Sequence, residues 1–179
     1  MEEKRKELKN DCSFSGITPL MLPFPYPPVK VQEQNQFYAN LLTVDYCGAV
    51  SELTAIAQYI HGESCVCCNY CTEAKTLIGI AVAEMIHLQK LAELIMLLGN
   101  GIDFTIPTRS GRAQMWTPEY VNLVNVMPGI ISSNIAAERA AIDQYEQHMR
   151  LIEDGCVNAV LARIVQDEEY HIMLLQMLQ

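Results

Sequence analysis

Two Glu-x-x-His pairs in apolar segments restrict the folds that this chain can adopt. The first pair is Glu84 and His87, and the second is Glu168 and His171. Residues three positions apart lie on the same face of a helix, so each pair points a carboxylate and an imidazole into whatever that helix packs against. A buried carboxylate needs a partner, and residues 78–98 contain too few cationic side chains to supply one. The two pairs therefore indicate a bound metal.

A lone glutamate precedes each pair, and its surroundings are repeated. Glu52 and Glu138 both begin the pattern Glu-x-x-Ala-Ile-x-Gln-Tyr, which ends at Tyr59 and Tyr145. The lone glutamate lies 32 residues before the glutamate of the first pair and 30 residues before that of the second. We therefore interpret the chain as two helical hairpins, each with one lone glutamate and one Glu-x-x-His pair.

The hydrophobic periodicity predicts an all-α fold. Few residues alternate with a period of two, so no sheet is expected. Short turns join the first two helices and the last two, which should lie antiparallel, whereas residues 100–129 are long enough to cross the length of a bundle. The prediction is a ferritin-like antiparallel four-helix bundle with one long crossover between the second and third helices. Its helices are expected over about 35–61, 69–98, 130–152 and 157–179.

Residues 1–34 are expected to form a charged tail and a Pro-rich N-terminal arm, ahead of a bundle over residues 35–179. Five prolines between Pro19 and Pro28 exclude a helix from the arm. Proline lacks a backbone donor and pushes the preceding residue to extended geometry. An apolar extended arm must cover something, and either the chain's own bundle or a neighbouring subunit would serve.

The charge balance and the apolar runs exclude two classes of partner. The chain has 12 Lys and Arg against 21 Asp and Glu, a net charge of −9, which argues against nucleic acid and anionic membranes. No secretory leader is visible, and charged residues such as Glu84 and Glu93 interrupt every long apolar run. We predict a cytoplasmic protein. Because the second helix and the arm are apolar, we also predict a homodimer or a larger homo-oligomer.

Two hairpins packed about a pseudo-twofold axis would bring four carboxylates and two imidazoles to one point. Four carboxylates at such short distances in a core of low dielectric repel one another, and most of them would bind protons. Two divalent cations would balance their four negative charges instead. Carboxylate and imidazole suit iron or manganese without choosing between them. We predict two Fe or two Mn ions per chain, with the ligands Glu52, Glu84, His87, Glu138, Glu168 and His171.

This set of ligands resembles the dinuclear carboxylate site of the ferritin-like superfamily. Within that superfamily, residues 26–31 of the arm, the helix that carries Glu52 and the segment Ala83–His87 are similar to manganese catalases and related spore-coat proteins. The ligand set also suits the diiron domain of rubrerythrins. Rubrerythrins carry an additional glutamate one turn from the third-helix ligand, but Ile135 and Ala141 flank Glu138 at those positions here, which argues against a seventh ligand.

The resemblance and the helix geometry together imply roles for these residues. Glu84 and Glu168 are expected to bridge the two ions. Glu52 and Glu138 would each chelate one ion, and His87 and His171 would complete the two sets of ligands. In sites like those of manganese catalases, the carboxylate of the fourth helix can instead act as an acid or base. Glu168 is therefore also the candidate catalytic residue.

A dinuclear centre with open positions can bind peroxide or dioxygen, exchange two electrons and use nearby carboxylates to move protons. The expected function is that of an oxidoreductase acting on hydrogen peroxide. Disproportionation of the catalase type needs no external reductant, whereas a peroxidase would need a separate electron donor. The alternative is a protein without turnover, which holds metal, handles iron or serves as a structural protein associated with stress or spores.

Several polar residues remain open to more than one interpretation. Tyr59 and Tyr145 lie near the face of the lone glutamates, where they would either hydrogen-bond the ligands or fill the core. His61 and His148 are expected to be solvated, because both lie close to helix ends. The cluster Cys65, Cys67, Cys68 and Cys71 could bind zinc or an iron–sulfur cluster, or act as redox thiols. The default interpretation is unbonded or adventitiously oxidised thiols.

Overall fold

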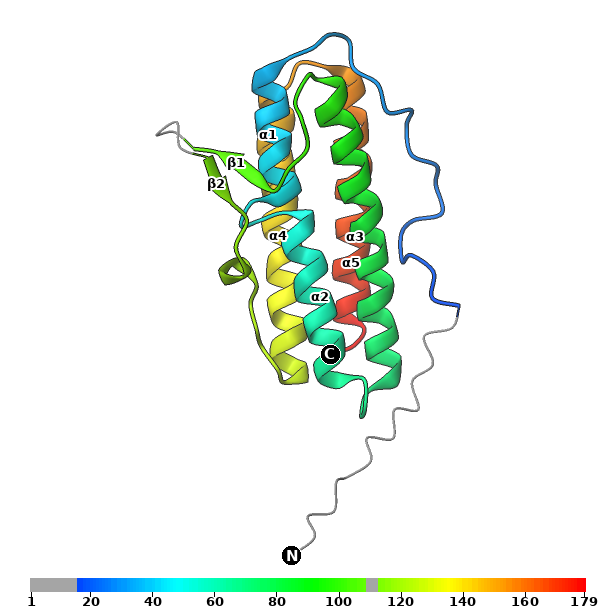
Figure 1. Ribbon diagram of the computed structural model, residues 1–179. Coiled ribbons are helices and arrows are strands. Elements are labelled where there is room, and N and C mark those ends of the chain that lie inside the picture. Colours follow the sequence, from blue (N-terminus) through cyan, green and yellow to red (C-terminus); the bar gives the residue numbers. More distant parts are fainter. Residues whose placement is uncertain (1–15, 109–112) are drawn as a thin grey trace, which may run out of the picture.

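The computed structural model of the chain describes residues 16–108 and 113–179 (Figure 1). The charged tail expected over residues 1–15 lies outside this part. The helices are α1 (Gln36–Cys47), α2 (Glu52–Val66), α3 (Cys71–Leu97), α4 (Met127–Leu151) and α5 (Gly155–Gln176). The connection between α3 and α4 holds two strands, β1 (Thr105–Pro107) and β2 (Ala113–Met115), and the 3-10 turn η1 (Pro118–Tyr120).

The helices form the predicted four-helix bundle. Helices α2 and α3 make one hairpin and α4 and α5 make the other, while α1 stands above α2 at the same end as the start of α5 (Figure 1). The connection from α3 to α4 is the one long crossover of the fold. The predicted architecture is therefore confirmed, with three local differences.

The first predicted helix is divided into α1 and α2. Gly48 ends α1 in an extended conformation, and a Cβ there would lie 2.6 Å from the carbonyl oxygen of Val44. Ser51 then caps α2, because its Oγ accepts a hydrogen bond from the backbone amide of Thr54 at 3.2 Å. The prediction of one continuous helix was wrong because the apolar period continues through these two caps.

Helix α2 also runs past its predicted end at residue 61. Gly62 lies inside the helix, where a Cβ would approach Cγ2 of Ile130 to 2.9 Å. This glycine therefore serves close packing between α2 and α4 and does not break the helix.

The prediction that the chain contains no sheet was also wrong. Strands β1 and β2 pair antiparallel, with Ile106 opposite Gln114. Each strand has three residues, too few to show an alternating period in the sequence. Beyond the sheet the crossover is tied to α2, because Trp116 Nε1 donates to Oγ1 of Thr54 at 2.9 Å and the Asn122 amide donates to Oε1 of Gln58 at 3.1 Å.

The apolar core consists of two clusters with a polar layer between them. On α3, for example, Leu91 and Leu94 belong to one cluster, whereas Leu77 and Ile80 belong to the other. The residues of α3 that lie between these positions include the Glu-x-x-His pair. Within the described residues, no helix is both long and apolar enough to cross a lipid bilayer.

The Pro-rich arm lies along the chain's own bundle in an extended conformation (Figure 1). One anchor is the amide of Leu20, which donates to the carbonyl oxygen of Gly79 on α3 at 3.0 Å. Another is the amide of Gln32, which donates to Oδ2 of Asp154 at 2.6 Å. Asp154 is also the N-cap of α5, so the arm connects both hairpins.

The cap at the start of α2 should contribute measurably to stability. Ser51→Ala removes the acceptor for the Thr54 amide, and we expect the free energy of unfolding to fall by about 1 kcal/mol in urea denaturation. Ser132→Ala, at an exposed position in α4, is the control and should change it by less than about 0.5 kcal/mol. Equal stability of the two variants would contradict the role of this cap.

Candidate metal centre

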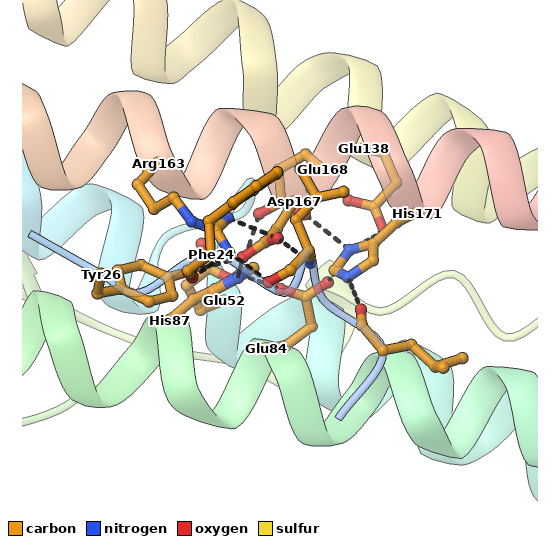
Figure 2. Close-up of polar contacts among 12 residues, drawn as sticks. Phe24, Tyr26, Glu52, Glu84, His87, Glu138, Arg163, Asp167, Glu168 and His171 are labelled. Atoms are coloured by element: carbon orange, nitrogen blue, oxygen red, sulfur yellow. Dashed lines mark hydrogen bonds and ion pairs between the residues drawn. The ribbon is translucent and has the colours of Figure 1, made fainter. Parts of the chain in front are cut away.

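All six predicted ligands lie in the polar layer between the two core clusters (Figure 2). Each of the four long helices contributes to the layer. None of the six residues is more than 3% exposed. They are Glu52 on α2, Glu84 and His87 on α3, Glu138 on α4, and Glu168 and His171 on α5.

The six side chains form two overlapping groups that could each surround a metal ion. One group contains Glu52 and His87, the other contains Glu138 and His171, and both contain Glu84 and Glu168. Within each group, one ligand atom per residue lies within 4.8 Å of the others. The two shared carboxylates therefore occupy the place that bridging ligands would need.

His171 turns its Nδ1 atom toward the carboxylates. Its Nε2 atom lies 2.8 Å from the carbonyl oxygen of Leu20, which can only accept a hydrogen bond, so Nε2 carries a proton. Nδ1 lies 2.9 Å from Glu168, 3.1 Å from Glu84 and 3.5 Å from Glu138. In the neutral imidazole a lone pair thus faces three carboxylates, an arrangement that requires either a second proton or a cation.

His87 repeats this orientation in the other group. Nδ1 lies 2.7 Å from Glu84, 3.2 Å from Glu168 and 3.6 Å from Glu52. Nε2 lies 3.3 Å from Oδ2 of Asp167 and donates to that carboxylate. Both imidazoles therefore direct Nδ1 into the centre and Nε2 away from it.

Asp167 was not among the predicted site residues, although it directly precedes Glu168. Its carboxylate accepts from the Leu22 amide at 2.8 Å and the Tyr26 hydroxyl at 2.7 Å, and Nη1 of Arg163 lies 2.6 Å from it. Burial opposes ionisation of Asp167, but the hydrogen bonds from His87 and these neighbours lower its pKa to about 2. Asp167 is thus a fixed anion behind His87.

The carboxylates repel one another strongly enough to require compensation. Burial, and then the charges of Glu84 and Glu168, raise the pKa values of Glu52 and Glu138 well above the usual range. Without cations these two carboxyls would take up protons. Oε1 of Glu84 is buried and accepts no hydrogen bond from the described residues, although Nδ1 of His171 lies 3.1 Å from it. A set of four carboxylates and two Nδ1 atoms with an orphaned oxygen fits two divalent ions of the iron or manganese type.

Two buried tyrosines bind the lone glutamates crosswise. The hydroxyl of Tyr59, on α2, donates to Glu138 on α4. The hydroxyl of Tyr145, on α4, donates to Glu52 on α2. Burial raises the pKa of both phenols, so both remain donors. The sequence left open whether these tyrosines bind the ligands or fill the core, and the structure shows reciprocal hydrogen bonds about a pseudo-twofold axis.

A cavity of about 220 Å³ adjoins the carboxylate side of the centre. All four glutamates line it, as do Tyr59 and Tyr145, but neither histidine does. At the crossover it is lined by Asn122, which is exposed. A water molecule takes up roughly 30 Å³ in the liquid, so the cavity has room for a small polar substrate.

Asp45 and His148 form a further polar pair, which the sequence did not reveal. His148 was expected to be solvated, but its Nδ1 atom lies 2.8 Å from Oδ2 of Asp45 and its side chain is only 12% exposed. Asp45 lines the cavity and also accepts from Nε2 of Gln144 at 2.7 Å, while burial raises its pKa. Gln58 and Gln144 are the glutamines of the repeated pattern Glu-x-x-Ala-Ile-x-Gln-Tyr. Their repetition was the one feature of the sequence that could have indicated a structural role for these two side chains.

The cysteines near the turn between α2 and α3 lie apart from this centre. Cys65 and Cys68 carry free thiols, whereas Cys71 is disulfide-bonded. Sγ of Cys65 lies 3.6 Å from Nε2 of His61, which is therefore not fully solvated. In the described part of the chain, neither group of side chains able to surround a metal includes a cysteine.

No protein-family model matches the chain. It is 28% identical over 160 residues to a "Probable manganese catalase" of Clostridium acetobutylicum, and the match covers 80% of this chain and 70% of that protein. Two crystal structures of KatB, a manganese catalase from Anabaena, superpose with a TM-score of 0.72 at 25% identity, covering 87% of this chain and 77% of theirs. The predicted resemblance to manganese catalases is therefore confirmed.

Divalent cations should stabilise this protein through the shared carboxylates. At 100 times the dissociation constant, Mn²⁺ should add about 2.7 kcal/mol, which raises the unfolding temperature by about 5–10 °C. Glu84→Gln keeps the side-chain size but removes one shared carboxylate, and it should abolish most of this shift in differential scanning fluorimetry.

Glu93→Gln is the matched control on the same helix, because Glu93 is partly exposed and, among the described residues, forms an ion pair with Lys90 alone, at 3.3 Å. This variant should keep the full shift. An equal shift in the two variants would show that Mn²⁺ binds elsewhere.

Proposed function

We propose that this protein, which resembles manganese catalases in sequence and in fold, is a dinuclear-metal oxidoreductase that disproportionates hydrogen peroxide. The observation that carries the proposal is the cavity of about 220 Å³, whose inner end is formed by the four carboxylates of the centre. This arrangement gives a small substrate access to the place where both ligand groups meet.

Two manganese ions per chain are the proposed cofactor, with iron as the alternative. One ion would be held by Glu52 and His87, the other by Glu138 and His171, and Glu84, which belongs to both groups, would be shared by the two ions. When bound, such a pair of ions supplies reversible two-electron exchange. The likeness to proteins described as manganese catalases supports manganese as the metal.

The protein's own residues would then manage the protons of the reaction. Disproportionation takes two electrons and two protons from one peroxide, which becomes dioxygen, and gives them to another, which becomes two waters. Glu168 lines the cavity and is the proposed acid and base for these transfers. Tyr59 and Tyr145 hold Glu138 and Glu52 in place from the cavity walls.

We also propose that the protein works as a homo-oligomer. Met85 and Met96 on α3 are 44% and 54% exposed, and Phe24 of the arm is 61% exposed. Apolar side chains of this size on a bundle that also carries an apolar arm support association between copies of the chain. The cytoplasmic location inferred from the sequence stays a prediction.

Oxygen evolution tests the proposed reaction directly. With two Mn²⁺ bound per chain, the protein should release one O₂ for every two H₂O₂ consumed, in the absence of any reductant, as measured with an oxygen electrode. Glu168→Gln should lower the rate by about 10²–10⁴-fold, the range typical for loss of a general acid or base. Metal analysis of the variant separates loss of proton transfer from loss of the ions.

Two other results would redirect the assignment. Peroxide consumption only in the presence of an added reductant would indicate a peroxidase with a separate electron donor. A fully loaded protein that consumes no peroxide under either condition would indicate a role in metal holding, iron handling or structure.

A further inference from the structure

The Pro-rich arm covers the side of the centre that the cavity does not reach. Figure 2 shows the arm running past the imidazoles between α3 and α5, with Phe24 and Tyr26 beside Arg163 and Asp167. The Nε2 atoms of both histidines point away from the four glutamates. Nε2 of His171 faces the arm itself, and Nε2 of His87 faces Asp167, whose carboxylate is hydrogen-bonded to the arm. The arm therefore supplies the Nε2 partner of His171 and contacts that of His87.

We propose that residues 20–26 of the arm are positioning residues of the metal centre, and that docking of the arm and binding of the metal stabilise each other. The inference rests on the proposed dinuclear site. It adds that the arm, which contributes no ligand, sets the orientation and the proton position of both histidine ligands.

The first contact joins the arm to His171. The Leu20 carbonyl oxygen accepts from Nε2 at 2.8 Å, and the Leu20 amide donates to the carbonyl oxygen of Gly79 at 3.0 Å. This arrangement depends on a glycine in α3, because a Cβ on Gly79 would lie 2.8 Å and 2.9 Å from Cγ and Cδ1 of Leu20. The arm is thus seated on α3 through one residue that also fixes His171.

The second contact reaches His87 through Asp167. The Leu22 amide and the Tyr26 hydroxyl both donate to this carboxylate, at 2.8 Å and 2.7 Å. Arg163 closes the cluster, because Nη2 donates to the carbonyl oxygens of Leu22 at 2.8 Å and Phe24 at 3.2 Å. Its guanidinium also lies 4.7 Å from the centre of the Tyr26 ring. Asp167 therefore keeps its orientation toward Nε2 of His87 because the arm is docked.

These contacts matter for the metal because a histidine ligand binds through the nitrogen that lacks a proton. A partner that accepts from Nε2 leaves the lone pair of Nδ1 facing the ion and holds the ring in place, and the loss of such a partner typically costs 10–100-fold in metal affinity. Coupling between two binding events is reciprocal. Bound metal must therefore stabilise the docked arm as much as the docked arm stabilises bound metal.

The first test weakens docking without changing a ligand. Tyr26→Phe removes one donor to Asp167, and Gly79→Ala pushes Leu20 away from α3. We expect each variant to bind Mn²⁺ about 10-fold more weakly, as measured by competition with a chelator for purified full-length protein. Alanine favours a helix more than glycine does, so weaker binding by Gly79→Ala cannot result from a less stable α3.

Matched controls come from the same chain. Tyr38→Phe removes a hydroxyl that accepts from the backbone amide of Glu153 at 3.1 Å, a contact that involves neither residues 20–26 nor their partners. Gly155→Ala places a methyl group in α5 where no atom of the described residues outside the local helix lies within 4 Å. Both controls should bind Mn²⁺ like the unmodified protein, and circular dichroism of the metal-free variants should show equal helix content throughout.

The second test measures the reciprocal effect by hydrogen exchange. The amides of Leu20 and Leu22 should exchange more slowly when Mn²⁺ is bound, since both donate hydrogen bonds only while the arm is docked. An unmodified protein that binds no metal would refute the proposed function. An unmodified protein that binds two ions, with unchanged affinity in both arm variants or unchanged exchange at the two leucines, would refute the role of the arm alone.

Discussion

The burial of four carboxylates in one layer of an apolar bundle is the constraint on which the rest of this structure depends. Moving each charge out of water costs several kcal/mol, and the apolar clusters on either side offer no compensating groups. The layer is stable only when protons or cations neutralise it. This need explains the polar groups around it, since the hydroxyls of Tyr59 and Tyr145 donate to the outer carboxylates and both imidazoles turn Nδ1 inward.

The two sides of the centre are built for different purposes. The cavity reaches the carboxylates from the side of α2 and α4, while the arm lies against the imidazole side formed by α3 and α5. A substrate therefore approaches the shared carboxylates without displacing the groups that orient the histidines. The groups that orient the histidines thus lie on the side of the centre that the cavity does not reach.

The sequence predicted the six inner residues because they depend on local rules. Helical period places Glu84 and His87 on one face, and the repeat aligns both hairpins, so no long-range information was needed. Asp167 escaped prediction because its role is set by Leu22 and Tyr26, more than 140 residues away. Asp45 and His148 meet for the same kind of reason, since α1 and α4 are distant in sequence. The caps at Gly48 and Ser51 were local but lay within an uninterrupted apolar period.

The repeat of the two hairpins makes the two groups of candidate ligands equivalent. It does not make the residues around the two groups equivalent. A pseudo-twofold axis relates His87 to His171, whereas the chain has a single N-terminal arm, which crosses the imidazole side in one direction. One histidine consequently donates to a neutral carbonyl oxygen, that of Leu20, and the other to the anion of Asp167. A carboxylate partner raises the basicity of an imidazole ligand more than a carbonyl does. The two proposed metal positions would therefore have the same kinds of ligand but unequal electrostatic surroundings.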